Sequence, residues 1–158
     1  HTIALQEQLI HKDIPFLLDL LKIDLQPLLV KGMNNYFCFR KYEEVLQERL
    51  FLSPQEEEDL RKLESYIEFS EAGSLSELPF SLSSGLWEKV GAERGNCTHV
   101  QCPHFKKCFF FKARRQIADA KILVINHHLL VAELSFRMRA DFRAWYLDLL
   151  VYQYFLDL

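Results

Sequence analysis

Apolar residues recur at helical spacing near the start of the chain. Between them stands the polar run Gln6-Glu7-Gln8, so residues 1–21 are predicted to form an amphipathic helix. Proline has no backbone N–H, so Pro15 is expected to end or kink that helix. The apolar positions of this stretch are Ile3, Leu5, Leu9 and Ile10.

Two further helices are expected in the middle of the chain. One covers about residues 40–50. The next is marked by Ser53-Pro54-Gln55-Glu56, where serine suits the N-cap, proline the first helical position and glutamate the reciprocal partner of the cap. Behind this signal Leu60, Leu63 and Ile67 recur at helical spacing, which predicts one packed face. Residues 72–84 are rich in serine and predict a loop.

Strand patterns occur at two places in the chain. Residues 25–32 are a short apolar run closed by glycine, more strand-like or turn-like than helical, and residues 122–125 are an apolar, β-branched run that predicts a buried strand. Helices are expected at about 110–120 and 127–134. The predicted fold class is therefore mainly α (α+β).

Length, composition and net charge indicate a globular protein and exclude some other classes of protein. The 158 residues are 49% hydrophobic and 26% charged, which is typical of a globular protein with a core. No stretch approaches the roughly 20 apolar residues of a membrane helix, so no membrane contact is expected. The net charge of −3 excludes a chain that is basic throughout.

The charges are unevenly distributed. Residues 43–77 carry eleven acidic and three basic side chains, whereas residues 94–121 carry seven basic side chains against Asp119 alone. Cations beside aromatic rings can contact phosphates and stack on bases. The basic half is therefore a candidate nucleic-acid surface, although its cations could equally form a solvated helix face.

Four phenylalanines lie within this basic stretch, at positions 105, 109, 110 and 111. We expect at least two of the three consecutive rings to be core rather than base-stacking platforms.

The cysteines form the clearest chemical pattern. Cys97-x4-Cys102-x5-Cys108 is a close triplet, and Cys38 lies fifty-nine positions before Cys97. Four thiolates are the ligand set of a 4Fe-4S cluster. One triplet and one distant cysteine favour a cluster, because structural zinc sites normally use two tight pairs.

Two other readings of the cysteines stay open at this point. A zinc ion could use the same thiolates, with His99 or His104 as substitutes, and would then stabilise an interaction module without DNA binding. Alternatively, the four residues could be free, buried cysteines.

Three segments carry a resemblance to a known family. They are HTIALQEQL at 1–9, VKGMNNYFC at 30–38 and CTHVQCPHFKKCFFFKARRQIADAKILVINHHLL at 97–130. Together they resemble the DinG-type helicases, bacterial relatives of the XPD group of superfamily 2. The resemblance implies an ATP-dependent, 5′-to-3′ DNA helicase whose first RecA-like α/β motor domain carries an inserted helical iron–sulfur domain.

The resemblance also implies roles for individual residues. The 4Fe-4S ligands would be Cys38, Cys97, Cys102 and Cys108. The DNA contacts would be His1 and Thr2, in a segment like helicase motif Ia, and Lys112, Arg114 and Arg115 near the unwinding junction. The implied partners are single-stranded or forked DNA and the remaining helicase motor domains, in the cytoplasm of a bacterium and associated with the nucleoid.

The sequence departs from the family in what it lacks. It contains no G-x-x-x-x-G-K-[ST] phosphate loop and no Asp-Glu-Ala-His box. We therefore interpret it as a helicase fragment that does not hydrolyse ATP alone, with ATP and Mg²⁺ bound only by the full-length parent. The expected domains are a motor-domain piece with the motif Ia-like helix (1–30), the iron–sulfur domain (31–112), a return into the motor domain (113–134) and an unassigned tail (135–158).

Overall fold

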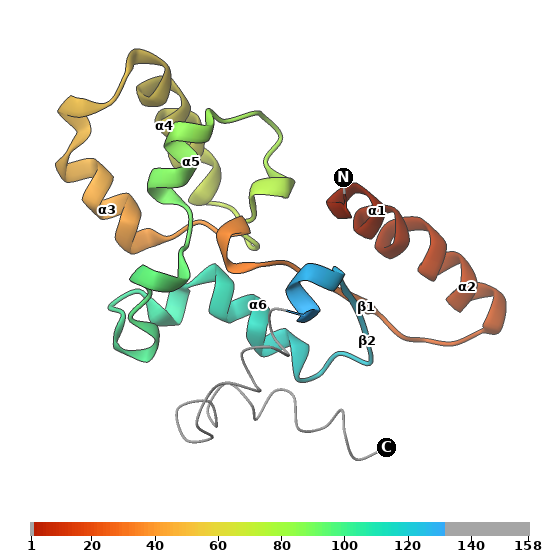
Figure 1. Cartoon of the computed structure of the whole chain (residues 1–158). Coiled ribbons are helices and arrows are strands. Elements are labelled where there is room, and N and C mark those ends of the chain that lie inside the picture. The colour runs from red at the N-terminus through yellow and green to blue at the C-terminus, as the bar shows by residue number, and fades with distance from the viewer. Residues whose placement is uncertain (1, 132–158) are drawn as a thin grey trace. The chain divides into compact units, whose positions relative to one another are not determined.

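The computed structural model describes residues 2–131 (Figure 1). Its longer elements, in chain order, are α1 Thr2–Gln8, α2 Ile14–Leu21, β1 Pro27–Val30, α3 Phe39–Gln47, α4 Pro54–Ile67, α5 Ser84–Val90, α6 Phe109–Ile117 and β2 Ile122–Ile125. Residues 127–131 are again helical. The prediction of a mainly α fold with a few strands is confirmed. The predicted tail at 135–158 lies outside the described residues.

The chain forms two compact units. One, here called the inserted unit, is Gly32–Lys112; the other, the flanking unit, joins residues up to Lys31 with those from Ala113 onward. Helix α6 begins in the inserted unit and ends in the flanking unit. That the inserted unit is an iron–sulfur domain and the flanking unit part of a motor domain stays a prediction.

The flanking unit is held by a two-stranded parallel sheet. β1 pairs with β2 in a register that places Pro27 opposite Ile122 and Val30 opposite Ile125. Both runs that the sequence marked as strand-like therefore form strands. Since the inserted unit lies between them in sequence, the chain leaves the sheet at Val30 and returns to it at Ile122.

Pro15 does not end the first helix. Instead, the five residues Leu9–Asp13 form a π-helical segment between α1 and α2, and Pro15 follows at the start of α2. A wider turn before proline reduces the clash of its ring with the preceding carbonyl, so the chain continues as a helix. Of the two predicted outcomes, an ended or a kinked helix, the first does not occur; a π-helical distortion precedes the proline.

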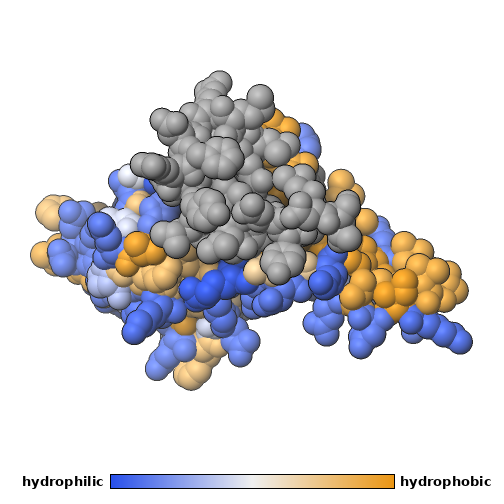
Figure 2. Space-filling model, turned by 90° about the horizontal axis from the view of Figure 1, so that it is seen from below, coloured by the Kyte–Doolittle hydropathy of each residue, from blue (hydrophilic) through white to orange (hydrophobic). Residues whose placement is uncertain are grey.

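Helix α2 exposes much of its apolar surface. Figure 2 shows this area in orange at the right of the view. The most exposed apolar side chains of α2 are Phe16 (68%), Leu20 (67%), Leu21 (62%) and Leu17 (51%). A continuous apolar face of this kind is typical of an interaction surface. Among residues 2–131, no helix is both long and apolar enough to cross a membrane.

The inserted unit has its core between α4 and α5. Leu60 and Leu63 from α4, and Leu86 and Val90 from α5, are fully buried. The sequence did not predict α5, because the helix has only seven residues and begins with serine and glycine. A helix this short depends on tertiary packing rather than on propensity.

The predicted start of α4 is confirmed in detail. The Ser53 side chain accepts a hydrogen bond from the Glu56 N–H (3.3 Å), and the Glu56 carboxylate accepts one from the Ser53 N–H (2.9 Å). This is the reciprocal capping box expected from the spacing. Further along α4, the buried Asp59 accepts a hydrogen bond from the Ser83 N–H (2.9 Å), so α4 also fixes the start of α5.

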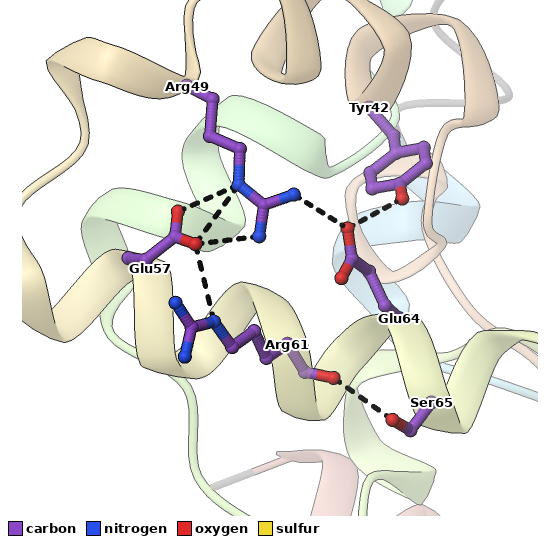
Figure 3. Close-up of polar contacts among 6 residues, drawn as sticks. All are labelled: Tyr42, Arg49, Glu57, Arg61, Glu64 and Ser65. Carbon is purple, nitrogen blue, oxygen red and sulfur yellow. Dashed lines mark hydrogen bonds and ion pairs between the residues drawn. The ribbon is translucent and has the colours of Figure 1, made fainter.

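An ion-pair network fixes the connection between α3 and α4 (Figure 3). The Arg49 guanidinium donates to Glu57 (2.6 Å) and lies 3.6 Å from Glu64. The Tyr42 hydroxyl also donates to Glu64 (2.9 Å), and burial together with this carboxylate raises the pKa of Tyr42 to about 12. Part of the acidic run is therefore internally paired rather than only solvated.

Two of the three consecutive phenylalanines are core residues, as predicted. Phe109 and Phe111 are 6% and 8% exposed. The Phe109 ring stacks on Phe39 with centroids 5.2 Å apart and lies close to Gly73. Phe110 contacts the buried Tyr36 ring edge-on at 5.8 Å. The start of α6 is thus anchored in the core of the inserted unit.

A side chain at position 73 would disturb the packing of Phe109. Gly73 has φ +55°, and a Cβ there would lie 2.2 Å from a ring atom of Phe109. We expect Gly73→Ala to lower the free energy of unfolding by about 2–4 kcal/mol, because the left-handed backbone and the overpacking both cost energy. Urea unfolding followed by circular dichroism measures this change.

Gly95→Ala is the matched control. A Cβ at Gly95 has nothing within 4 Å, so its effect should stay within about 0.5 kcal/mol. Equal stability of the two variants would contradict the packing described for Phe109.

Candidate metal centre

All four cysteines of the chain line one recess of the inserted unit. The recess encloses about 400 Å³, counting the part open to solvent, and each cysteine is partly exposed. The sequence-predicted ligands Cys38, Cys97, Cys102 and Cys108 are thus brought together. The other side chains around the recess include Met33, Arg40, Lys41, Phe105 and Phe111.

The triplet reaches the recess through a repeated local structure. Three short 3₁₀ turns, Arg94–Asn96, His99–Gln101 and Phe105–Lys107, are each followed directly by a cysteine in extended conformation. A 3₁₀ turn reverses the chain within three residues. Cysteines five and six positions apart can therefore face the same space.

Cys38 is delivered by backbone pairing rather than by local turns. Phe37 forms an isolated antiparallel bridge with Gly91. On either side of it, the Cys38 N–H donates to the Val90 carbonyl (2.8 Å) and the Ala92 N–H donates to the Tyr36 carbonyl (2.7 Å). The segment that leads to Cys97 is thereby held beside Cys38.

The environment of two thiols, Cys97 and Cys108, disfavours free thiolates. Burial raises the pKa of Cys97 and of Cys108, and the charges of neighbouring cysteines raise both further. Backbone N–H groups oppose this effect, from His99 at Cys97 and from Phe111 and Phe110 at Cys108. Amides aimed at sulfur stabilise a thiolate whose charge is shared with a metal.

The structure gives the two candidate histidines other contacts. The His104 Nε2 lies 2.8 Å from the Glu43 carboxylate, and the His99 ring packs against Phe111 with centroids 5.6 Å apart. Neither lines the recess. In the described part of the chain, no three His, Cys, Asp or Glu side chains converge closely enough to hold a single metal ion. All four thiols nevertheless line this one recess, and four thiolates are the ligand set of a 4Fe-4S cluster.

The predicted DNA contacts fall in different places. His1 lies outside the described residues, and Thr2 is the first residue of α1. The Lys112 ammonium donates to the Glu71 carbonyl (3.0 Å), so this cation ties α6 to the inserted unit. Arg114 and Arg115 lie in the last turn of α6, where cations also favour the helix dipole.

Sequence reasoning missed two cations of the recess, Arg40 and Lys41. They lie in the first turn of α3, directly after Cys38 and Phe39. An Arg-Lys pair immediately behind an isolated candidate ligand was the available signal. The larger basic block at 94–121 dominates the charge pattern of the sequence and obscures this pair.

Known proteins resemble this chain at the level of sequence. It is 33% identical to the ATP-dependent DNA helicase YoaA of Escherichia coli K12 over 132 residues, which are 83% of this chain and 21% of YoaA. It is 29% identical over 144 residues to the ATP-dependent DNA helicase DinG of Photobacterium profundum, covering 85% and 21%. DinG of E. coli K12 is 27% identical over 149 residues, with the same coverage. No family model matches the chain.

The fold and the recess define a helical, cysteine-lined domain inserted between two paired parallel strands. The sequence comparisons specify the family: the chain belongs to the DinG-type helicases, and the resemblance seen in the sequence is confirmed. It spans 21% of the length of the curated relatives it matches.

The turn after Cys97 is sensitive to residue type. His99 has φ 52°, a left-handed conformation that β-branched residues disfavour. We expect His99→Val to lower the free energy of unfolding by about 1–2 kcal/mol, whereas His99→Gly should be neutral or stabilising. Urea titration of the purified chain measures both.

Thr98→Val is the control for this substitution, because Thr98 has φ −89° and tolerates a β-branched residue. If both valine variants were equally stable, the backbone described for the Cys97 turn would be wrong.

Proposed function

We propose that this chain is the iron–sulfur segment of an ATP-dependent, 5′-to-3′ DNA helicase. The observation that carries the proposal is the gathering of all four cysteines around one recess of one compact unit. The names of the relatives support the helicase class. ATP hydrolysis with Mg²⁺ is assigned to the full-length parent, since this sequence holds neither a phosphate loop nor an Asp-Glu-Ala-His box.

Cys38, Cys97, Cys102 and Cys108 would hold a 4Fe-4S cluster. When bound, the cluster supplies a covalent cross-link among four thiolates and couples folding to metal loading. The role proposed for it is structural. The ligands stand at the start of α3, in the turns of the triplet and just before α6, so their residues fix these three elements in one arrangement.

Helix α6 is the proposed connection between the cluster and DNA. Cys108 directly precedes it, and its last turn carries Arg114 and Arg115. Because adjacent residues differ by about 100° around a helix, the two arginines would contact different phosphates. A rigid start of α6 would hold these cations in a constant position on a single strand near the fork.

The exposed face of α2 is the proposed contact with the remaining motor domains. Its apolar side chains are on the surface here. Each Å² of apolar surface that is buried contributes about 25 cal/mol, which would favour association of this face with a matching apolar surface. The partners proposed for the full protein are therefore its own motor domains and single-stranded or forked DNA.

Removing one ligand tests the cluster. Anaerobically purified chain should be brown, with broad visible absorbance, and Cys102→Ser should lose most of this absorbance together with its iron. A lower melting temperature is expected as well, because metal binding contributes folding free energy. Visible spectra, iron analysis and thermal unfolding measure the three effects.

Gln101→Ser, at the exposed neighbouring position, is the control and should keep colour and stability. A colourless wild-type chain that binds stoichiometric zinc would support the zinc-stabilised module instead. Unchanged iron in Cys102→Ser would refute the ligand assignment.

A charge-neutral variant of α6 tests the DNA contact. Arg115→Gln should weaken binding to single-stranded DNA and reduce the slope of log K against log salt by about 0.7, the value for one phosphate contact on a single strand. Fluorescence anisotropy at several salt concentrations measures this slope.

Arg61→Gln is the matched control, since Arg61 is an exposed arginine on the acidic helix α4. An equal loss of affinity in both variants, or binding that does not depend on salt, would count against a DNA site on α6.

A further inference from the structure

Two cations share the recess with the four thiols. Arg40 and Lys41 both line it, and both project from the first turn of α3, immediately behind Cys38. Their side chains are only 26% and 13% exposed. Cations that are covered to this extent are not part of a solvated helix face. The role of each side chain therefore follows from the groups that it contacts.

Arg40 connects the lone cysteine to the triplet. Its guanidinium donates to the carbonyl of Asn96 (2.6 Å), the residue directly before Cys97. A second guanidinium nitrogen pairs with Glu44 one turn along α3, which directs the side chain. The planar fork thus bridges the helix that follows Cys38 and the backbone that leads to Cys97.

Lys41 reaches a different part of the unit. Its ammonium donates to the Glu88 carbonyl near the end of α5 (2.7 Å) and lies 3.8 Å from the Glu93 carboxylate. Glu93 in turn accepts a hydrogen bond from the Asn96 side chain (3.0 Å). Lys41 therefore contacts the end of α5 and Glu93, whereas Arg40 contacts the residue directly before Cys97.

The charge of Arg40 suits a site that gathers thiolates. A cation that is always protonated offsets the mutual repulsion of the sulfurs without competing for the metal. Arginine can supply this charge and two directed hydrogen bonds together, which a lysine ammonium cannot do in the same geometry.

We propose that Arg40 is a positioning residue for the cluster, which holds the Asn96–Cys97 backbone against α3 and so keeps Cys97 across the recess from Cys38. This role rests on the proposed function, because it concerns retention of the cluster. Arg40 acts through the backbone before Cys97 and does not itself ligate the metal.

The rate of cluster release tests this role. In Arg40→Gln, an excess of an iron chelator should remove the cluster about 10-fold faster than in the wild-type chain, as expected for an outer-shell partner. Arg40→Lys keeps the charge but loses the fork, and it should release nearly as fast as Arg40→Gln. The loss of visible absorbance under anaerobic conditions gives the rates, and circular dichroism verifies that each variant is folded.

Arg61→Gln is the control, because it also removes an arginine that pairs with a glutamate one turn away, but on α4. It should release iron at the wild-type rate. If Arg40→Gln is not recovered in folded form, Arg40→Lys carries the same comparison.

The outcomes separate this inference from the proposed function. A wild-type chain without iron and sulfide would overturn both. A wild-type chain that holds the cluster, with an Arg40→Gln variant that releases it at the same rate, would overturn only the role of Arg40. Full recovery of the wild-type release rate by Arg40→Lys would show that the charge alone matters. That result would also overturn the proposal that the Arg40 guanidinium holds the Asn96–Cys97 backbone against α3.

Discussion

The short antiparallel pairing between Phe37 and Gly91 is the constraint on which the cysteine recess depends. Bringing Cys38 to a triplet fifty-nine residues away costs about 3–4 kcal/mol in loop-closure entropy. Full burial of a large apolar side chain contributes about 1.5–3 kcal/mol, and Phe37, Leu86 and Val90 are all buried around this pairing. Two or three such residues therefore offset the cost. The protein's own core therefore holds Cys38 near the triplet, and the proposed cluster would not have to close the loop by itself.

The inserted unit interrupts the flanking unit in sequence but does not interrupt its sheet. β1 and β2 are parallel neighbours, although the whole inserted unit separates them in sequence. The chain therefore leaves and re-enters the sheet at adjacent strands, without breaking its pairing. Helix α6 provides the return, beginning at the buried Phe109 and ending at the buried Ile117. The first residues of α6 therefore belong to the inserted unit and its last residues to the flanking unit.

Local signals in the sequence predicted local structure well. The Ser53 capping box, the strand at Ile122 and the burial of Phe109 and Phe111 each follow from neighbouring residues, and each is observed. The cysteine set was also identifiable from its spacing. Two features that sequence reasoning missed depend on distant contacts. Helix α5 exists because α4 packs on it, and Arg40 contacts a carbonyl fifty-six residues away. The π-helical segment before Pro15 is a local feature that the helical spacing of residues 1–21 did not indicate.

We propose that the four thiols share one inorganic cluster. Iron and acid-labile sulfide per chain, measured in protein purified without oxygen, test this proposal. About four of each are expected, bound together and lost together. Iron without sulfide, a single bound ion per chain, or sulfide and iron retained after all four cysteines are replaced would contradict it.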